Sequence, residues 1–350
     1  MKRFLVGSTL SWLLIASVQA LEPLPTSVPV PADNPMTVDK IELGKSLYFD
    51  PRLSIDGTIS CNSCHNVMTN GTDNRSVSVG VRGQHGGRSS PTVYNAAFLS
   101  SQFWDGRAST LEEQAKGPIL NPIEMGMPSA QAVVDRLKGV PDYVSWFQHV
   151  FGGQGETAVT YTHVAQAIAA YERTLVTPNS PFVCYWYGDH QALSASAQRG
   201  MQKVTSLGCT SCHMGPNFSG PAGMPMGQGF FMKFPTFDQS KLALPYIQRY
   251  HLMDDKGRFS VTHQPGDLHM WRVPTWRNIA LTAPYFHNGS VATLDEAVRV
   301  MAATQLNKTL SDAEVADIVA FLDSLTGVFP QQTMPRLPET PHHTVVGDAH

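Results

Sequence analysis

The sequence predicts a mainly α-helical protein of two domains with long loops. Helix signals recur along the chain, and no segment shows the sustained alternation of a β-strand. The length of 350 residues exceeds the roughly 100–200 residues of one domain. Gly and Pro number 28 and 25, whereas charged residues make up only 15% of the chain, below the ~25% of a typical soluble domain. We therefore expect much irregular but ordered backbone.

Composition also limits the functional class. Hydrophobic residues make up 42% of the chain, and 25 Lys and Arg stand against 28 Asp and Glu. This ordinary core content and slightly acidic balance exclude a disordered tail, a collagen-like repeat and a nucleic-acid-binding module. No nucleic-acid partner is expected.

Residues 1–20 have the features of a signal peptide. Lys2 and Arg3 precede an apolar run over residues 4–18, and small residues lead to a cleavage site after Ala20. The rival interpretation is a membrane anchor, but polar residues interrupt the run, which falls short of the ~20 apolar residues that span a bilayer. We expect export to the periplasm without a stable membrane anchor. Cleavage would leave 23 Lys and Arg against 28 Asp and Glu.

The helices are predicted from capping and periodicity. The first, over residues 37–47, opens at Thr37, and an Ala-rich helix covers residues 157–174. Capping boxes open helices at Thr110, Thr293 and Ser311, and the last of these carries an apolar face over residues 312–325. Residues 215–274 lack clear periodicity and are expected to form a functional or cofactor-wrapping loop.

Turn residues at 176–181 suggest the boundary between the two domains. We place the N-terminal domain at residues 21–178 and the C-terminal domain at residues 179–330. Residues 331–350 form a tail of loop character that is expected to pack back on the first domain.

Four of the five cysteines form two C-x-x-C-H motifs, which start 148 residues apart. The first motif contains Cys61, Cys64 and His65, and the second contains Cys209, Cys212 and His213. Two thiols at this spacing add to the vinyl groups of one porphyrin, and the histidine supplies an axial nitrogen to the iron. A zinc ribbon and a thioredoxin-like site are the alternatives. The export signal favours two covalent haem c groups, one in each of two cytochrome c-like domains.

The fifth cysteine, Cys184, is expected to be a small buried hydrophobe. Seven methionines of the second domain are candidates for a sixth haem ligand, and Met301 has the advantage of a capped helix. Spacing alone does not choose among Met214, Met224, Met226, Met232, Met253, Met270 and Met301. In the first domain, Glu124 lies between Pro122 and Pro128 and is a candidate for proton transfer, although an ordinary exposed glutamate is the alternative.

Four stretches closely resemble the bacterial di-haem cytochrome c peroxidases. They are S-P-T-V-Y-N-A at 90–96, F-W-D-G-R at 103–107, N-P-I-E-M-G at 121–126, and the run from V-P-T to P-Y-F-H-N-G at 273–289. The resemblance covers nearly the whole mature chain. It implies a peroxidatic haem on His65 and an electron-transfer haem on His213 and Met301.

The resemblance also implies roles for further residues. Gln114 and Glu124 match the distal amide and the acid/base carboxylate, and Trp104 matches the tryptophan between the haems. Family members bind calcium between the domains through carbonyl groups at the positions of Thr282 and Pro284.

Two positions depart from the family pattern. Ser89 replaces an asparagine that supplies a calcium ligand, so calcium depends on the serine oxygen or on water. The histidine that caps the resting peroxidatic haem in many members is replaced by Val81, which leaves His85 as the candidate in that loop. Its flanking glycines suit a movable loop, whereas a solvent-facing imidazole is the alternative.

The leading hypothesis is an enzyme that reduces hydrogen peroxide to water. Its two electrons would come from a small periplasmic donor, either a cytochrome c or a blue-copper protein. The alternatives are a related di-haem enzyme that oxidises residues of a partner protein and a non-enzymatic di-haem electron carrier. Enzymes of the first kind carry Tyr where Met301 stands here. A homodimer is expected from the resemblance.

Overall fold

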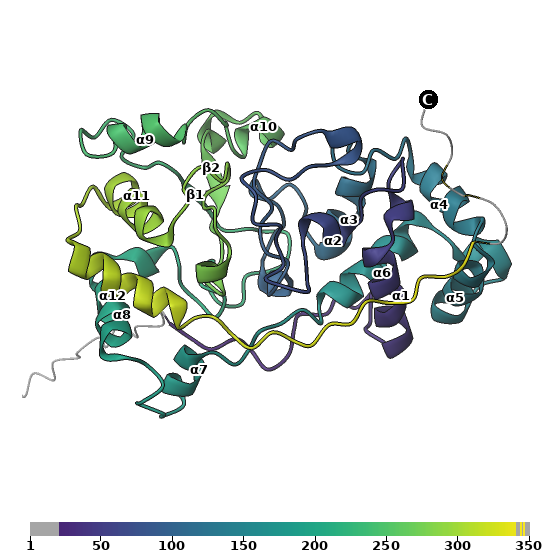
Figure 1. Cartoon of the computed structure of the whole chain (residues 1–350), viewed down its shortest axis with the longest axis horizontal. Coiled ribbons are helices and arrows are strands. Elements are labelled where there is room, and N and C mark those ends of the chain that lie inside the picture. The colour runs from purple at the N-terminus through teal and green to yellow at the C-terminus, as the bar shows by residue number, and fades with distance from the viewer. Residues whose placement is uncertain (1–20, 341–343, 345, 347–350) are drawn as a thin grey trace, which may run out of the picture.

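The computed structural model describes residues 21–340, 344 and 346, so the predicted signal peptide lies outside the described residues. Its backbone is mainly helical, which confirms the predicted fold class. Figure 1 shows helices α1–α6 gathered at one end of the molecule and α7–α12 with a small sheet at the other. Within the described residues, no helix is both long enough and apolar enough to cross a bilayer.

The first half is built from six helices. They are α1 (Val38–Phe49), α2 (Cys61–Cys64), α3 (Leu111–Leu120), α4 (Ala130–Lys138), α5 (Pro141–Phe151) and α6 (Tyr161–Glu172). Helix α6 begins later than predicted, because Gly155–Ala158 forms a separate 3-10 turn and Thr160 is the N-cap.

The second half contains six helices and a two-stranded antiparallel sheet. They are α7 (Pro181–Trp186), α8 (Ala195–Leu207), α9 (Leu244–Tyr250), α10 (Phe259–Thr262), α11 (Leu294–Leu306), α12 (Asp312–Asp323), β1 (Phe231–Lys233) and β2 (Met270–Arg272). The expectation of an unbroken loop over residues 215–274 was therefore wrong. Its helices and strands are only three to seven residues long, too short for periodicity to stand out.

The capping predictions were partly wrong. Ser311 forms a full capping box, in which its backbone N–H donates to Glu314 at 2.9 Å. Thr110 and Thr293 do accept the amide of the third helical residue. The matching carboxylates bond elsewhere: Glu113 accepts from Lys116 at 2.7 Å and Glu296 from the Tyr250 hydroxyl at 2.6 Å. Each threonine cap is therefore one-sided.

In each half, a glycine allows two helices to pack closely. A Cβ added at Gly44 in α1 would lie 1.8 Å from the Ala167 carbonyl oxygen in α6, and one at Gly200 in α8 would lie 1.9 Å from that of Asp317 in α12. Only glycine allows these backbones to approach so closely. The α1–α6 crossing lies in one apolar core and the α8–α12 crossing in another.

Cys184 is exposed, so the expectation of a buried cysteine was wrong. Helix α7 is a single short turn that directs Phe182 and Val183 into the core of the second half. Cys184, the next residue, then points to the other side of the helix.

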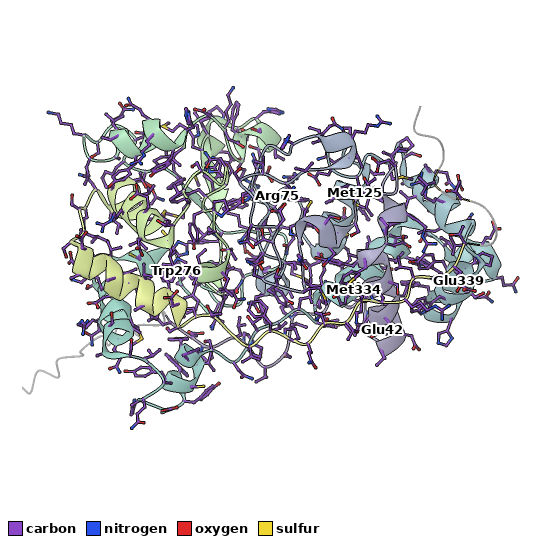
Figure 2. The ribbon with its side chains drawn as sticks, in the orientation of Figure 1. Glu42, Arg75, Met125, Trp276, Met334 and Glu339 are labelled. Atoms are coloured by element: carbon purple, nitrogen blue, oxygen red, sulfur yellow. The ribbon has the colours of Figure 1, made fainter. Side chains whose placement is uncertain are left out.

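The C-terminal segment after α12 returns to the first half. Lys45 of α1 donates to Thr333 at 3.0 Å, and Tyr171 of α6 donates to Gln332 at 2.8 Å. Figure 2 shows Met334 of this segment beside α1. Arg52 donates to the Pro338 carbonyl at 2.9 Å. These contacts join the last described residues to the helices that surround the first C-x-x-C-H motif.

Candidate active site

A cavity of about 550 Å³ lies beside α2, lined mostly by the first half and partly by residues of the second half such as Asp255. The first C-x-x-C-H motif lines it through Cys61, Cys64 and His65, and so do Gln114 and Glu124. Its volume falls within the roughly 300–1,000 Å³ of small-molecule and cofactor sites. The structure thus brings the first cysteine motif and the predicted distal residues to one space.

His65 is prepared to bind a metal through one ring nitrogen. Its Nδ1 lies 2.9 Å from the Pro91 carbonyl oxygen, so Nδ1–H donates and Nε2 keeps its lone pair. The Tyr48 hydroxyl donates to the His65 carbonyl at 2.7 Å and holds the backbone. Burial lowers the pKa of His65, which favours the neutral imidazole that iron requires.

Glu124 lies on a turn that begins at Asn121, as its position between two prolines suggested. The Asn121 side-chain amide donates to Glu124 Oε1 at 2.9 Å, and the Glu124 backbone N–H donates to the Asn121 carbonyl at 3.1 Å. Burial raises the pKa of Glu124, and the charge of Arg107 opposes this effect. Glu124 is half-buried, which contradicts the alternative of an ordinary exposed glutamate, and a carboxyl whose pKa burial raises is suited to gaining and losing a proton.

Gln114 lies on α3, which Thr110 caps. It is half-buried and reaches the same cavity as Glu124, while Glu113 beside it is exposed. An amide at this place can donate to a ligand in the cavity without changing charge.

Trp104 joins the two halves. It lines the cavity and also packs against an apolar cluster of the second half that includes Met301. Its Nε1–H donates to the Ser89 carbonyl at 2.8 Å, and its own carbonyl accepts from the Arg272 backbone N–H at 2.9 Å. One bond therefore holds the indole and the other holds the backbone of Trp104.

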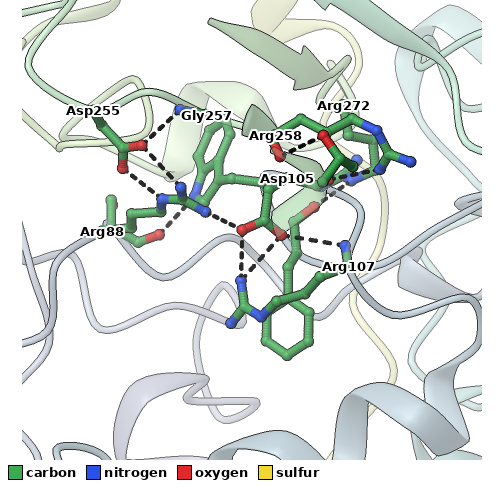
Figure 3. Close-up of polar contacts among 11 residues, drawn as sticks. Arg88, Asp105, Arg107, Asp255, Gly257, Arg258 and Arg272 are labelled. Atoms are coloured by element: carbon green, nitrogen blue, oxygen red, sulfur yellow. Dashed lines mark hydrogen bonds and ion pairs between the residues drawn. The ribbon is translucent and has the colours of Figure 1, made fainter. Parts of the chain in front are cut away.

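Asp105, the residue after this tryptophan, belongs to an arginine–carboxylate cluster (Figure 3). Arg88 Nη1 lies 2.5 Å from Asp105, and Arg88 Nε lies 2.7 Å from Asp255 of the second half. Arg107 adds a 3.1 Å contact to Asp105. Arg272 is buried and donates from Nε to the Phe103 carbonyl at 2.9 Å. The cluster ties the F-W-D-G-R segment to the second half.

The second C-x-x-C-H motif has a similar arrangement around its histidine. His213 Nδ1 lies 3.0 Å from the Phe218 carbonyl oxygen, and its ring stacks on Trp276 at 4.4 Å between centroids. Burial lowers the pKa of His213 to about 4. Figure 2 shows Trp276 in the opposite half from Met125, which lines the first cavity.

Met301 is half-buried on α11, which Thr293 caps. Ile279 and Leu294 pack both against the cluster that holds Met301 and against the core beside Cys209. Met301 and the second cysteine motif thus border one continuous apolar region.

His85 does not line the cavity. It is exposed and pairs with Val79 in an isolated β-bridge, while its neighbours Gly86 and Gly87 reach the cavity wall. Val81, at the place of the family's capping histidine, is buried.

The candidate calcium positions lie on segments that contact each other. The Ser89 backbone N–H donates to the His287 carbonyl at 2.8 Å, so the Ser89 segment meets the P-Y-F-H run. The Thr282 hydroxyl donates to the Ile279 carbonyl at 3.1 Å. Pro284 follows a cis peptide bond, and the Asn74 amide donates to the Ala283 carbonyl at 2.7 Å.

Comparison with known proteins identifies the family of this chain. The model of the di-haem cytochrome c peroxidases matches residues 38–191. The cytochrome c551 peroxidase of Pseudomonas aeruginosa is 45% identical, and the alignment covers 92% of this chain and 89% of that protein. The chain belongs to the di-haem cytochrome c peroxidase family. The cytochrome c551 peroxidase of Nitrosomonas europaea is 42% identical over 90% of this chain and 88% of that protein.

A solved structure shares the fold of this peroxidase family member. It is a MauG-like protein associated with microbial copper homeostasis, with a TM-score of 0.73 and 31% identity. The match covers 87% of this chain and 95% of that one. The identity to the cytochrome c551 peroxidases shows that this chain is a peroxidase, and its family implies two haem c groups.

The residues around the first cavity fit a covalent haem c. Two thiols and a neutral imidazole line the same wall of an apolar space, which is the donor set that the cofactor needs. Sequence reasoning missed Glu172, Arg88 and Asp255, which also line this cavity. Arg88 precedes Ser89, so the sequence could have indicated it as a site residue. Nothing in the sequence brings Asp255 to the same place.

Proposed function

We propose that this peroxidase works in the periplasm and reduces hydrogen peroxide to water with electrons from a small cytochrome c or blue-copper protein. One observation carries the proposal: the first cysteine motif shares a cavity with a half-buried carboxyl and an amide, Glu124 and Gln114. An electron carrier has no use for a proton-transferring carboxyl at the haem, so this arrangement favours an enzyme over a non-enzymatic carrier.

Bound haem would supply an iron that accepts a peroxide oxygen and passes on electrons. The protein would supply the proton transfers. Glu124 would accept a proton from one peroxide oxygen and donate it to the other, which would leave as water. Its half-buried position supports this role, because loss of hydration raises its pKa above the ordinary value of a glutamate. Gln114 donates a hydrogen bond that orients the bound peroxide.

Electrons would enter through the second half. His213 and Met301 are the proposed axial ligands of the haem attached at Cys209 and Cys212. Trp104 would connect this haem to the first, because its ring borders both the cavity and the Met301 cluster. A neutral His213 and a thioether ligand favour a raised haem potential, which suits acceptance of electrons.

Replacement of Glu124 by Gln tests the reaction. We expect Glu124→Gln to lower the turnover number by about 10²–10⁴-fold, the usual contribution of general acid–base catalysis. Absorption spectra of both haems should stay unchanged. Glu113→Gln is the matched control, because Glu113 is an exposed carboxylate on the neighbouring helix and does not line the cavity. Near-normal peroxidase rates in Glu124→Gln would refute the proposed role.

The axial ligands are open to direct measurement. We propose Met301 on the second haem and expect Met301→Ala to turn that haem high-spin in electron paramagnetic resonance. His85 is proposed as a resting-state ligand of the first haem, which it would reach by movement of its loop, at Gly86 and Gly87, from its present exposed position. Unchanged first-haem spectra in His85→Ala would exclude His85 and leave an enzyme that needs no reductive activation.

A calcium ion is proposed between Ser89 and the Thr282–Pro284 segment. Hard oxygen donors suit this ion, and the Ser89 and His287 backbones already join the two segments. Metal analysis after dialysis without chelator should find about one calcium per chain, and chelation should lower the melting temperature. No bound calcium in the holoenzyme would exclude the site.

Export, oligomeric state and donor complete the proposal. We propose cleavage after Ala20, which N-terminal sequencing of the periplasmic protein tests directly. A homodimer is proposed, with sedimentation analysis as its test. The likeness to a MauG-like structure favours one alternative function, the oxidation of residues in a partner protein. Steady-state rates with hydrogen peroxide and a reduced cytochrome c or blue-copper protein distinguish it from the peroxidase.

A further inference from the structure

Glu172 is a buried carboxyl at the wall of the haem cavity. It is the last residue of α6, only 6% exposed, and it lines the cavity together with Cys61. Its Oε2 atom is inaccessible to solvent and makes no hydrogen bond to another described residue. A carboxylate in this state would be costly, because burial removes its hydration and no donor replaces it.

The charged groups around Glu172 do not neutralise it. The cation that follows it in the chain, Arg173, already binds Glu112, with contacts of 2.7 and 3.0 Å. Glu112 itself, on α3, adds a like charge. Burial is the main reason that the pKa of Glu172 rises to about 8.

The other titratable groups beside Glu172 bond elsewhere. The Tyr48 hydroxyl of α1 donates to the His65 carbonyl at 2.7 Å. The Tyr171 hydroxyl donates to Gln332 at 2.8 Å. Cys61 of α2 becomes a thioether when haem is attached and then cannot titrate. Of Glu172 and these neighbours, Glu172 is therefore the group left free to bind a proton when the charge in the cavity changes.

We propose that Glu172 binds a proton when the haem attached at Cys61 and Cys64 is reduced, and releases it when that haem is oxidised. One electron, supplied by an electrode or by a strong one-electron reductant such as dithionite, converts ferric to ferrous iron. One proton from solvent converts the Glu172 carboxylate to the carboxylic acid, so the charge in the cavity does not change. The inference rests on haem attachment at this cavity and not on the peroxidase reaction.

The physical reason is electrostatic coupling. Reduction adds one negative charge to the cavity, and a nearby buried carboxylate interacts with it strongly because the surroundings have a low dielectric constant. The proton affinity of Glu172 therefore rises on reduction, and the haem potential becomes dependent on pH.

Other acids of the cavity are rivals that the experiment must separate. Glu124 lines the same cavity and burial raises its pKa too. Asp105 is held by Arg88 and Arg107, so it is expected to stay ionised. The haem propionates are shared by every variant and cancel in the comparison.

The test is a spectroelectrochemical titration of the holoenzyme from about pH 6 to about pH 9, which brackets the pKa of about 8. Proteins compared are the wild type, Glu172→Gln, Glu124→Gln and the exposed control Glu113→Gln. For one proton per electron, the potential of the first haem falls by up to about 59 mV for each tenfold change in proton concentration. We expect Glu172→Gln to lose at least half of the wild-type slope, and Glu113→Gln to keep it.

A wild-type slope that persists in Glu172→Gln, or that disappears only in Glu124→Gln, overturns the inference. A flat wild-type potential overturns it as well. Should Glu172→Gln fail to fold, Glu172→Asp is expected to keep the slope at a shifted pH, and the wild type alone provides a second measurement. Its redox-difference infrared spectrum should contain the carbonyl stretch of one carboxylic acid that appears on reduction, and absence of that band refutes the idea. Loss of the slope in Glu172→Gln would stand even if the proposed peroxidase role of Glu124 failed.

Discussion

Arg88 is the residue whose removal should weaken the contact between the two halves most. Its guanidinium binds Asp105 of the first half at 2.5 Å and forms two contacts to Asp255 of the second half, at 2.7 and 2.9 Å. The same guanidinium lies 5.0 Å from the centre of the Trp271 ring. Arg88→Met removes all three interactions and retains an apolar side chain of similar length.

The cost follows from the burial of the groups left behind. The Asp105 side chain is only 4% exposed, and removal of one partner of a buried ion pair costs about 3–5 kcal/mol. Arg107 still reaches Asp105 at 3.1 Å, which moves the value toward the lower end. The Asp255 side chain is 26% exposed, so solvent screens its loss and adds only about 0–1 kcal/mol. We expect the free energy of unfolding to fall by about 3 kcal/mol.

The assay is urea unfolding of the holoenzyme, followed by circular dichroism in the helical region. Arg336→Gln is the matched control, because Arg336 and Glu339 form an ion pair with side chains 88% and 77% exposed, and it should change the stability by less than about 0.5 kcal/mol. Arg88→Lys should be intermediate, since an ammonium keeps the charge but loses the bidentate contact. A loss below about 1 kcal/mol in Arg88→Met would refute the claim that this cluster holds the halves together.

Two further predictions concern the first half. Glu112→Gln should cost about 3 kcal/mol near neutral pH in urea unfolding, because Arg173 is 1% exposed and loses its partner. Hydrogen bonds and the charge of Arg173 lower the pKa of Glu112 against the effect of burial. The extra stability of the wild type over Glu112→Gln is therefore present above pH 4.5 and should vanish as the pH falls through the folded-state pKa of Glu112. A difference in stability that does not change with pH would contradict this. Gly44→Ala should cost about 3 kcal/mol or more in thermal unfolding, because the added Cβ would meet the Ala167 carbonyl at 1.8 Å. Gly266→Ala, which meets nothing within 4 Å, is its control, and equal melting temperatures for the two variants would show that α1 and α6 can separate at little cost.

The sequence predicted helix starts correctly where the interaction that caps the helix lies within a few residues of the chain. Thr37 caps α1 and Ser311 caps α12, because a side-chain oxygen satisfies an amide a few residues away and leaves a readable pattern. The two glutamates predicted to complete capping boxes bind other side chains: Glu113 accepts from Lys116, and Glu296 accepts from the distant Tyr250. Competition between partners of this kind is settled by tertiary structure, so the sequence alone does not reveal it.

The candidate site divides in the same way. Cys61, Cys64 and His65 follow from a spacing that the porphyrin itself imposes, and no tertiary information is needed to find them. No sequence motif or spacing indicated Glu172. Its importance comes from its position in the cavity and from the commitment of Arg173 to Glu112, and both depend on the packing of α3 against α6.

The position of Trp104 depends on both halves at once. Its indole donates to the Ser89 carbonyl, and the backbone N–H of Ser89 in turn donates to His287 of the second half. Arg88 is the neighbour of Ser89, so its ion pairs act directly on the backbone that holds the indole. A change that loosens Arg88 should therefore reduce electron transfer between the haems before it alters either haem spectrum, because each histidine is held by a carbonyl of its own half. Rapid-kinetic reduction of the first haem through the second in Arg88→Met measures this, and an unchanged rate would mean that Trp104 keeps its place without the cluster.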